Sequence, residues 1–158
     1  MRIGHGYDIH RLAKGERLVL GGVEIPHEAG LVGHSDADVV LHAVTDALLG
    51  AIAAGDIGRH FPDRSPENAG RASSDFVREA MRLVCERGYA VANVDVTVHA
   101  EAPRLAPHVD QMRERIAALL GIGLDATSVK ATRGEGLGPI GQGEALAAQA
   151  IVLLSPVP

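Results

Sequence analysis

Residues 33–51 of the chain read GHSDADVVLHAVTDALLGA and include its most apolar helical segment. From Val39 onward, apolar side chains recur at the spacing of an α-helix and cover most of its circumference. We therefore expect a helix that lies in the core. Ser35 or Asp36 is suited to cap its first turn, and Gly55 is suited to end it.

Segments on both sides of this helix alternate between strand and helix patterns. We expect strands at 2–10, 17–25, 94–98, 128–132 and 146–154, and helices at 73–88 and 107–121. The first two strands are expected to form a hairpin. Two segments show neither helical nor strand periodicity, and we expect them to be loops: a long one at 55–71 and a glycine-rich one at 133–143. This alternation predicts a mixed α and β fold, and a length of 158 residues fits one domain.

Composition excludes several classes of function. The chain has 15 Lys plus Arg, 20 Asp plus Glu and 3% aromatic residues, which argues against nucleic-acid binding. No apolar run approaches the roughly 20 residues of a membrane span, and no signal peptide is recognisable. Cys85 is the single cysteine, so an internal disulfide is impossible. We expect a soluble cytoplasmic protein in which Cys85 is a small buried hydrophobe.

Asp8, His10 and His42 are candidate metal ligands. Asp8 and His10 are two apart in an expected strand, so their side chains leave the same face. His42 lies on the apolar helix, with Asp38 and Asp46 four residues to either side on the same face. Each unsatisfied buried polar group costs about 1–3 kcal/mol, so Asp38, His42 and Asp46 on this helix need internal partners, a metal or a wet cleft.

Two imidazoles and one carboxylate would leave one zinc position open for substrate or water. The same donor set also binds non-haem iron. Two other interpretations remain open at this point. Asp8 and His10 could be ordinary surface residues, and His42 could be a core histidine with internal partners.

Further polar residues lie in expected loops. His34 and Ser35 precede the buried helix, where backbone N–H groups favour a phosphate, although a serine there is often only a cap. Asp56 and Asp63 are either hydroxyl acceptors or turn formers. Glu135 is either a ligand of a hard cation such as Mg²⁺ or a solvated loop acid.

Five motifs in order resemble one family nearly end to end. They are MRIGHGYDIHRL at 1–12, the run at 33–51, DIGRHFPD at 56–63, NVDVTVHAEAPRLAPH at 93–108 and VKATRGEGLG at 129–138. Together they resemble the 2-C-methyl-D-erythritol 2,4-cyclodiphosphate synthase family. The resemblance implies an α+β fold in which residues 1–158 form a single domain, a mixed β-sheet with helices packed on one face. It also implies a homotrimer whose active sites lie at subunit interfaces.

The resemblance also assigns site residues. Zn²⁺ would be bound by Asp8, His10 and His42, and a second ion, Mg²⁺ or Mn²⁺, by Glu135. His34 and Arg133 match the positions that stabilise the transition state. Substrate contacts are implied for the zinc ligands Asp8 and His10, for Ile9, His34, Ser35, Asp56, Ile57, Gly58, Phe61, Pro62, Asp63, Arg64, Ser65, Pro139 and Gln142, and in the neighbouring subunit's nucleotide pocket for Ala100, Glu101, Ala102, Pro103, Arg104, Leu105, Ala106, Thr132, Arg133, Gly134 and Glu135.

The implied reaction is intramolecular. The 2-phosphate of 4-diphosphocytidyl-2-C-methyl-D-erythritol 2-phosphate attacks the β-phosphorus of the diphosphate, CMP leaves, and a cyclic diphosphate forms. Two cations would screen the charge repulsion and align the reacting groups, so no protein nucleophile is required.

Three positions depart from the family pattern. Arg133 stands where a threonine is usual, Pro139 where an aromatic residue is usual, and Gln142 where an arginine is usual. The metal ligands are unaffected, but the finer phosphate contacts differ. Relatives use the arginine near the threefold axis, so we expect Gln142 to weaken binding of isoprenoid diphosphates there.

Two other functions compete with this interpretation. A zinc hydrolase would need a general base near the metal, and Asp38 or Asp46 could serve. A non-catalytic trimer that stores or senses zinc would need no base at all.

Overall fold

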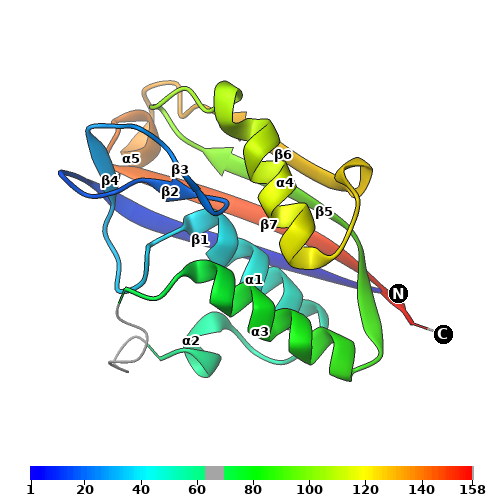
Figure 1. Ribbon diagram of the computed structural model, residues 1–158. Helices are drawn as coiled ribbons and strands as arrows, with labels where there is room; N and C mark the ends of the chain where they lie inside the picture. Colours follow the sequence, from blue (N-terminus) through cyan, green and yellow to red (C-terminus); the bar gives the residue numbers. More distant parts are fainter. Residues whose placement is uncertain (63–69, 158) are drawn as a thin grey trace.

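The computed structural model describes residues 1–62 and 70–157 (Figure 1). The longer elements are β1 (Arg2–Lys14), α1 (Val39–Ala51), α3 (Ser73–Glu86), β5 (Tyr89–His99), α4 (Val109–Leu120), β6 (Thr127–Thr132) and β7 (Ala145–Pro156). Short elements connect them: β2 (Val19–Leu20), β3 (Val23–Glu24), β4 (Ala29–Leu31), α2 (Ile57–His60) and α5 (Gly138–Gly141). The expected helices and the strands expected at 2–10, 94–98, 128–132 and 146–154 are confirmed, although most bounds differ by a few residues.

The central sheet has five strands in the order β4-β1-β7-β5-β6. Strands β5 and β6 are parallel and the other neighbours are antiparallel, so the sheet is mixed. Helices α1, α3 and α4 gather on one side of it (Figure 1). The chain is therefore an α+β domain with one helical layer, as expected.

The hairpin expected between residues 2–10 and 17–25 is wrong. Strand β1 pairs instead with β7 along Arg2 to Arg11 and with β4 along Leu12 to Lys14. Residues 17–25 fold back on themselves as the β2–β3 hairpin. The reason lies in Gly21 and Gly22, which both have positive φ, the backbone form that a tight two-residue turn requires.

Helix α1 is the buried element that its sequence predicts. It lies against β1, β7 and α3, and only Asp46 and Gly50 within it are not buried. Its expected cap is wrong: Asp38, rather than Ser35 or Asp36, accepts from the N–H groups of Val40 and Leu41, both at 3.1 Å. The helix also ends at Ala51, before Gly55.

Two glycines let α1 approach β1 very closely. A Cβ atom added to Gly4 would lie 1.8 Å from the carbonyl oxygen of Ala47, and one added to Gly6 would lie 1.9 Å from that of Ala43. Any side chain at these positions would therefore push the helix off the strand.

The expectation for Cys85 is wrong. Its side chain is exposed, because the buried face of α3 consists of Phe76, Val77, Ala80 and Val84. Within the described residues, no helix combines the length and the apolar character needed to cross a membrane.

The close approach of α1 to β1 predicts that Gly6→Ala destabilises the fold. Overpacking of a core typically costs about 1–3 kcal/mol, and the obstacle here is backbone that cannot rotate away. Urea unfolding measures the effect. The control is Gly50→Ala, where the nearest atom to an added Cβ is 3.9 Å away. A loss of stability for Gly6→Ala no larger than that for Gly50→Ala would contradict the prediction.

Candidate active site

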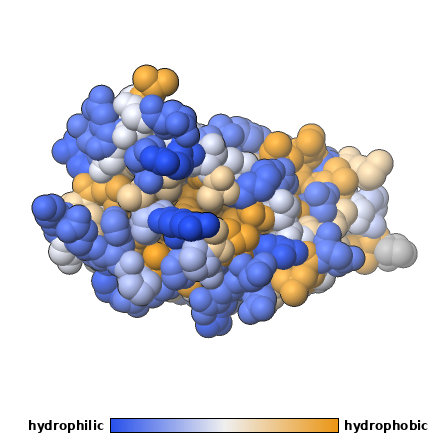
Figure 2. All heavy atoms as spheres, turned by 90° about the horizontal axis from the view of Figure 1, so that it is seen from above, coloured by the Kyte–Doolittle hydropathy of each residue, from blue (hydrophilic) through white to orange (hydrophobic). Residues whose placement is uncertain are grey.

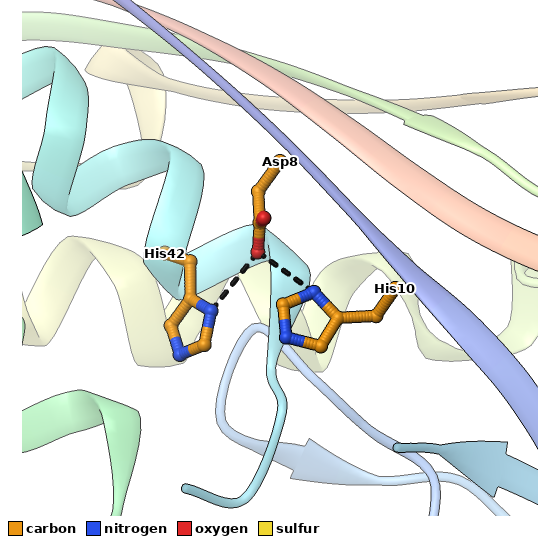
Figure 3. Close-up of side chains that lie close together, drawn as sticks. All are labelled: Asp8, His10 and His42. Carbon is orange, nitrogen blue, oxygen red and sulfur yellow. Dashed lines mark hydrogen bonds and ion pairs between the residues drawn. The ribbon is translucent and has the colours of Figure 1, made fainter. Parts of the chain in front are cut away.

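Strand β1 and helix α1 bring three side chains to one point (Figure 3). Asp8 and His10 leave the face of β1 that meets α1, and His42 reaches them from the helix. Asp8 Oδ2 lies 2.9 Å from Nδ1 of His42 and 3.0 Å from Nδ1 of His10. One ligand atom from each residue lies within 4.8 Å of the others. The predicted convergence of these residues is confirmed.

The charges in this cluster support one another. Burial acts to raise the pKa of the Asp8 carboxyl, but the interactions with the imidazoles of His10 and His42 hold that pKa well below its usual range. Burial acts to lower the pKa of His42, but the Asp8 carboxylate outweighs it and the net pKa is raised. Asp8 therefore stays a carboxylate across the neutral range and can neutralise a cation.

The donor set fits a divalent metal ion. His10 Nδ1 is buried and lacks a hydrogen-bond partner, although it lies 3.0 Å from Asp8 Oδ2. That nitrogen is close to the carboxylate without being aimed along a hydrogen bond to it. Two imidazoles and one carboxylate suit zinc and other transition metals. Among residues 1–62 and 70–157, these three form the one such cluster.

A cleft of about 250 Å³ opens beside the cluster. Besides the three candidate ligands, it is lined by Gly33, His34, Ser35, Ile57, Phe61 and Phe76. Of the expected substrate contacts, His34, Ser35, Ile57 and Phe61 thus meet the candidate metal ligands. The cleft joins a polar floor to apolar walls, as a site that orients a phosphate and excludes water requires.

Other expected contacts in this region lie elsewhere. Asp56 caps α2 by accepting from Arg59 N at 2.9 Å, and neither Asp56 nor Gly58 lines the cleft. Ile9 is exposed on the opposite face of β1. Pro62 does not line the cleft either, and Asp63, Arg64 and Ser65 lie outside the described residues.

Asp38 and Asp46 hold the backbone rather than face a substrate. Asp38 is fully buried and accepts from four N–H groups, those of Gly21, Gly22, Val40 and Leu41. Burial raises its pKa to about 6, although these backbone donors act in the opposite direction. Asp46 accepts from Ile57 N at 2.7 Å. The idea that Asp38 shares a helical face with His42 is wrong, since Asp38 precedes the helix.

A second pocket, of about 550 Å³, lies where β5 and β6 end. It is lined by Ala100, Glu101, Pro103, Arg104, Leu105, Ala106, Ala131, Thr132, Arg133 and Glu135. This set contains most of the expected nucleotide pocket. Of the rest, Gly134 donates its N–H to Glu101 at 3.1 Å, and Ala102 lines a neighbouring pocket.

Arg133 and Glu135 are thus not beside the candidate metal ligands of their own chain. Arg133 is paired with Glu101, and this ion pair lowers the pKa of the Glu101 carboxyl. The two pockets have no lining residue in common. Pro139, in α5, and Gln142, at its end, line neither pocket.

Sequence reasoning missed three residues beside the candidate ligands. Phe76 of α3 lines the cleft, and Ser73 lies 2.9 Å from His42 Nε2. Asp36, expected only as a possible cap, accepts hydrogen bonds from Ser73 instead. A serine at the start of a helix is also a common cap, so no local pattern distinguishes this role.

Fold and site define an α+β domain that carries a metal-binding triad beside a cleft. The pattern of the YgbB family matches residues 1–155, and the chain belongs to that family. It is 57% identical over 154 residues to the 2-C-methyl-D-erythritol 2,4-cyclodiphosphate synthase of Ectopseudomonas mendocina, covering 98% of each chain. The enzyme of that name from Moorella thermoacetica is 58% identical, with 98% of this chain and 94% of that one covered.

Solved structures agree with this assignment. A 2C-methyl-D-erythritol-2,4-cyclodiphosphate synthase superposes with a TM-score of 0.91 at 41% identity, covering 98% of this chain and 100% of that chain. IspF from Plasmodium falciparum in complex with CDP gives 0.87 at 35% identity, covering 99% and 97%.

The cluster predicts that His42→Ala loses its metal. Elemental analysis of the purified native chain should find roughly one tightly held divalent ion per chain, and the variant should hold far less. His27→Ala is the matched control, because it removes an imidazole that does not line the cleft. Full metal occupancy in His42→Ala would show that the ligands are assigned wrongly.

Proposed function

We propose that the chain is a 2-C-methyl-D-erythritol 2,4-cyclodiphosphate synthase of the non-mevalonate isoprenoid pathway. It closes the diphosphate of 4-diphosphocytidyl-2-C-methyl-D-erythritol 2-phosphate into a ring and releases CMP. One observation carries the proposal. Asp8, His10, His42, His34 and Ser35 converge on one cleft in a chain more than half identical to enzymes of this name.

In this reaction an oxygen of the 2-phosphate forms a bond to the β-phosphorus. The bond from that phosphorus to the bridging oxygen breaks, and CMP leaves with the electron pair. The nucleophile belongs to the substrate, so the protein supplies position and charge. Zn²⁺ held by Asp8, His10 and His42 would stabilise the negative charge on the phosphate oxygens.

Residues around the cleft divide the remaining tasks. His34 and Ser35 are the polar groups placed to bind the reacting phosphate. Ile57, Phe61 and Phe76 form apolar walls that exclude water, which would otherwise compete as the nucleophile. Asp8 remains ionised beside the cation, because its pKa is held low.

The pocket at the ends of β5 and β6 would bind the cytidine diphosphate part of the substrate. CDP complexes are known for structures of this fold. Glu135 is an exposed carboxylate in that pocket, placed to hold Mg²⁺ or Mn²⁺ against the diphosphate. Arg133 faces Glu101 in the same wall, so its charge is already partly neutralised.

A homotrimer would complete the site by joining the two pockets across an interface. Support comes from the face of the sheet that α1 does not cover. Ile3, Tyr7, Ile9 and Ile151 lie on that face and are between 43% and 70% exposed. Seen from above, the molecule also shows hydrophobic surface between its polar regions and toward the end that carries both termini (Figure 2). Apolar surface of this kind typically marks a protein interface.

The two competing functions are less well supported by the site. A zinc hydrolase needs a free general base, but Asp38 and Asp46 are both engaged by backbone N–H groups. A zinc-binding trimer without turnover would leave the second pocket, at the ends of β5 and β6, without a role.

Product analysis tests the proposed reaction. The native protein is incubated with the diphosphocytidyl substrate, Zn²⁺ and Mg²⁺, and the products are monitored by ³¹P NMR. CMP and a cyclic diphosphate should appear in equal amounts. His42→Ala should be slower by about 10²-fold or more, because it loses electrostatic stabilisation in the transition state. Release of inorganic phosphate would support a zinc hydrolase. Tight metal binding without any turnover would support a non-catalytic zinc-binding protein.

Mixing two inactive variants tests the interfacial site. His42→Ala and Glu135→Ala should each be inactive as homotrimers. After subunit exchange of equal amounts, about a quarter of the native activity should return. In randomly mixed trimers, about a quarter of the interfaces join a chain with intact His42 to a neighbour with intact Glu135. Light scattering should give the mass of three chains. No recovery after verified exchange would place the whole site in one chain.

A further inference from the structure

A line of hydrogen bonds leads from His42 away from the metal cluster. Nδ1 of His42 faces Asp8, whereas Nε2 lies 2.9 Å from the hydroxyl of Ser73, the first residue of α3. The same hydroxyl donates to Oδ1 of Asp36, and the backbone N–H of Ser73 donates to Oδ2 of Asp36 at 3.0 Å. Asp36 thus holds Ser73 at two points, and Ser73 contacts the ring of a candidate ligand.

The direction of these bonds fixes a proton on Nε2 of His42. A carboxylate only accepts hydrogen bonds, so the single hydroxyl proton of Ser73 points at Asp36. The lone pairs of Ser73 Oγ then face His42, and Nε2 must carry a proton to donate to them. Nδ1 faces the ionised Asp8 carboxylate and donates to it at 2.9 Å while no metal is bound, so Nδ1 is the nitrogen that gives up its proton when a metal binds.

Ser35 does not replace this arrangement. Its hydroxyl oxygen lies 3.1 Å from His42 Nε2 and also accepts from Ala37 N at 3.1 Å. Among the described residues no carboxylate contacts the Ser35 hydroxyl, so Ser35 can present either a proton or a lone pair to the ring. Ser73 is also fully buried, which keeps water from competing for the bond.

We propose that Ser73 and Asp36 are positioning residues of the metal site. They hold His42 in the tautomer and orientation in which Nδ1 binds the ion, and they act through His42 rather than on the substrate. The proposal rests on the metal binding by Asp8, His10 and His42 proposed above. Outer partners of metal-binding histidines commonly have this function, and their loss typically weakens metal binding by about 10–100-fold.

The test uses the full-length chain and a zinc titration in competition with a chromophoric chelator. Ser73→Ala should bind Zn²⁺ about 10–100-fold more weakly than the native chain. Ser74→Ala is the matched control: it removes the next serine on α3, whose hydroxyl is exposed and accepts from Arg78. This control should bind Zn²⁺ like the native chain.

A second readout separates positioning from a general loss of structure. Imidazole ¹⁵N shifts of zinc-loaded protein should show His42 with a proton on Nε2 and metal on Nδ1 in the native chain, and a weakened Nε2 hydrogen bond in Ser73→Ala. Thermal unfolding of the zinc-free variant should stay close to that of Ser74→Ala. If Ser73→Ala does not fold, Asp36→Asn, which frees the serine proton to turn, provides the same comparison and should also weaken Zn²⁺ binding.

The outcomes are distinct. Native affinity and unchanged ¹⁵N shifts in a folded Ser73→Ala chain would overturn the positioning role and leave the metal site standing. Absence of Zn²⁺ binding by the native chain would overturn both the metal site and the positioning role. Coordination through Nε2 in the native chain would also refute the positioning role, since that nitrogen would then face away from Ser73.

Discussion

The close contact between the backbones of α1 and β1 is the constraint on which the rest of the structure depends. It exists because Gly4 and Gly6 have no side chains where the carbonyl oxygens of Ala47 and Ala43 approach the strand. The same strand face continues into Asp8 and His10, and the residue before Ala43 is His42. The contact that forms the core therefore also assembles the candidate metal site, and the spacing of its ligands follows from the packing distance.

The local part of this arrangement could be predicted from the sequence. Two-residue periodicity placed Asp8 and His10 on one face, and the apolar pattern of 39–51 identified the buried helix that carries His42. The partners of β1 could not be predicted, because pairing with β7 joins residues more than a hundred positions apart. Asp38 was misjudged for a related reason: two of its four donors, Gly21 and Gly22, come from a distant hairpin.

Ser73 and the second pocket show a different limit. The contact between Ser73 and His42 depends on how α3 packs beside α1, which no local pattern encodes. Most of Ala100 to Ala106 and Thr132 to Glu135 line one pocket. Only the family resemblance brought these two segments together at the level of sequence, since their proximity follows from the parallel pairing of β5 with β6. Arg133 replaces the usual threonine and adds a positive charge. Glu101 lies beside it and balances that charge in an ion pair.

Anomalous diffraction at the zinc absorption edge, from crystals grown with Zn²⁺, tests most directly whether the contact of β1 with α1 builds a metal site. We expect one strong peak per chain, about 2.0–2.3 Å from a carboxylate oxygen of Asp8, a ring nitrogen of His10 and Nδ1 of His42. A peak bound elsewhere, or no peak in crystals grown with an excess of Zn²⁺ over protein, would contradict it.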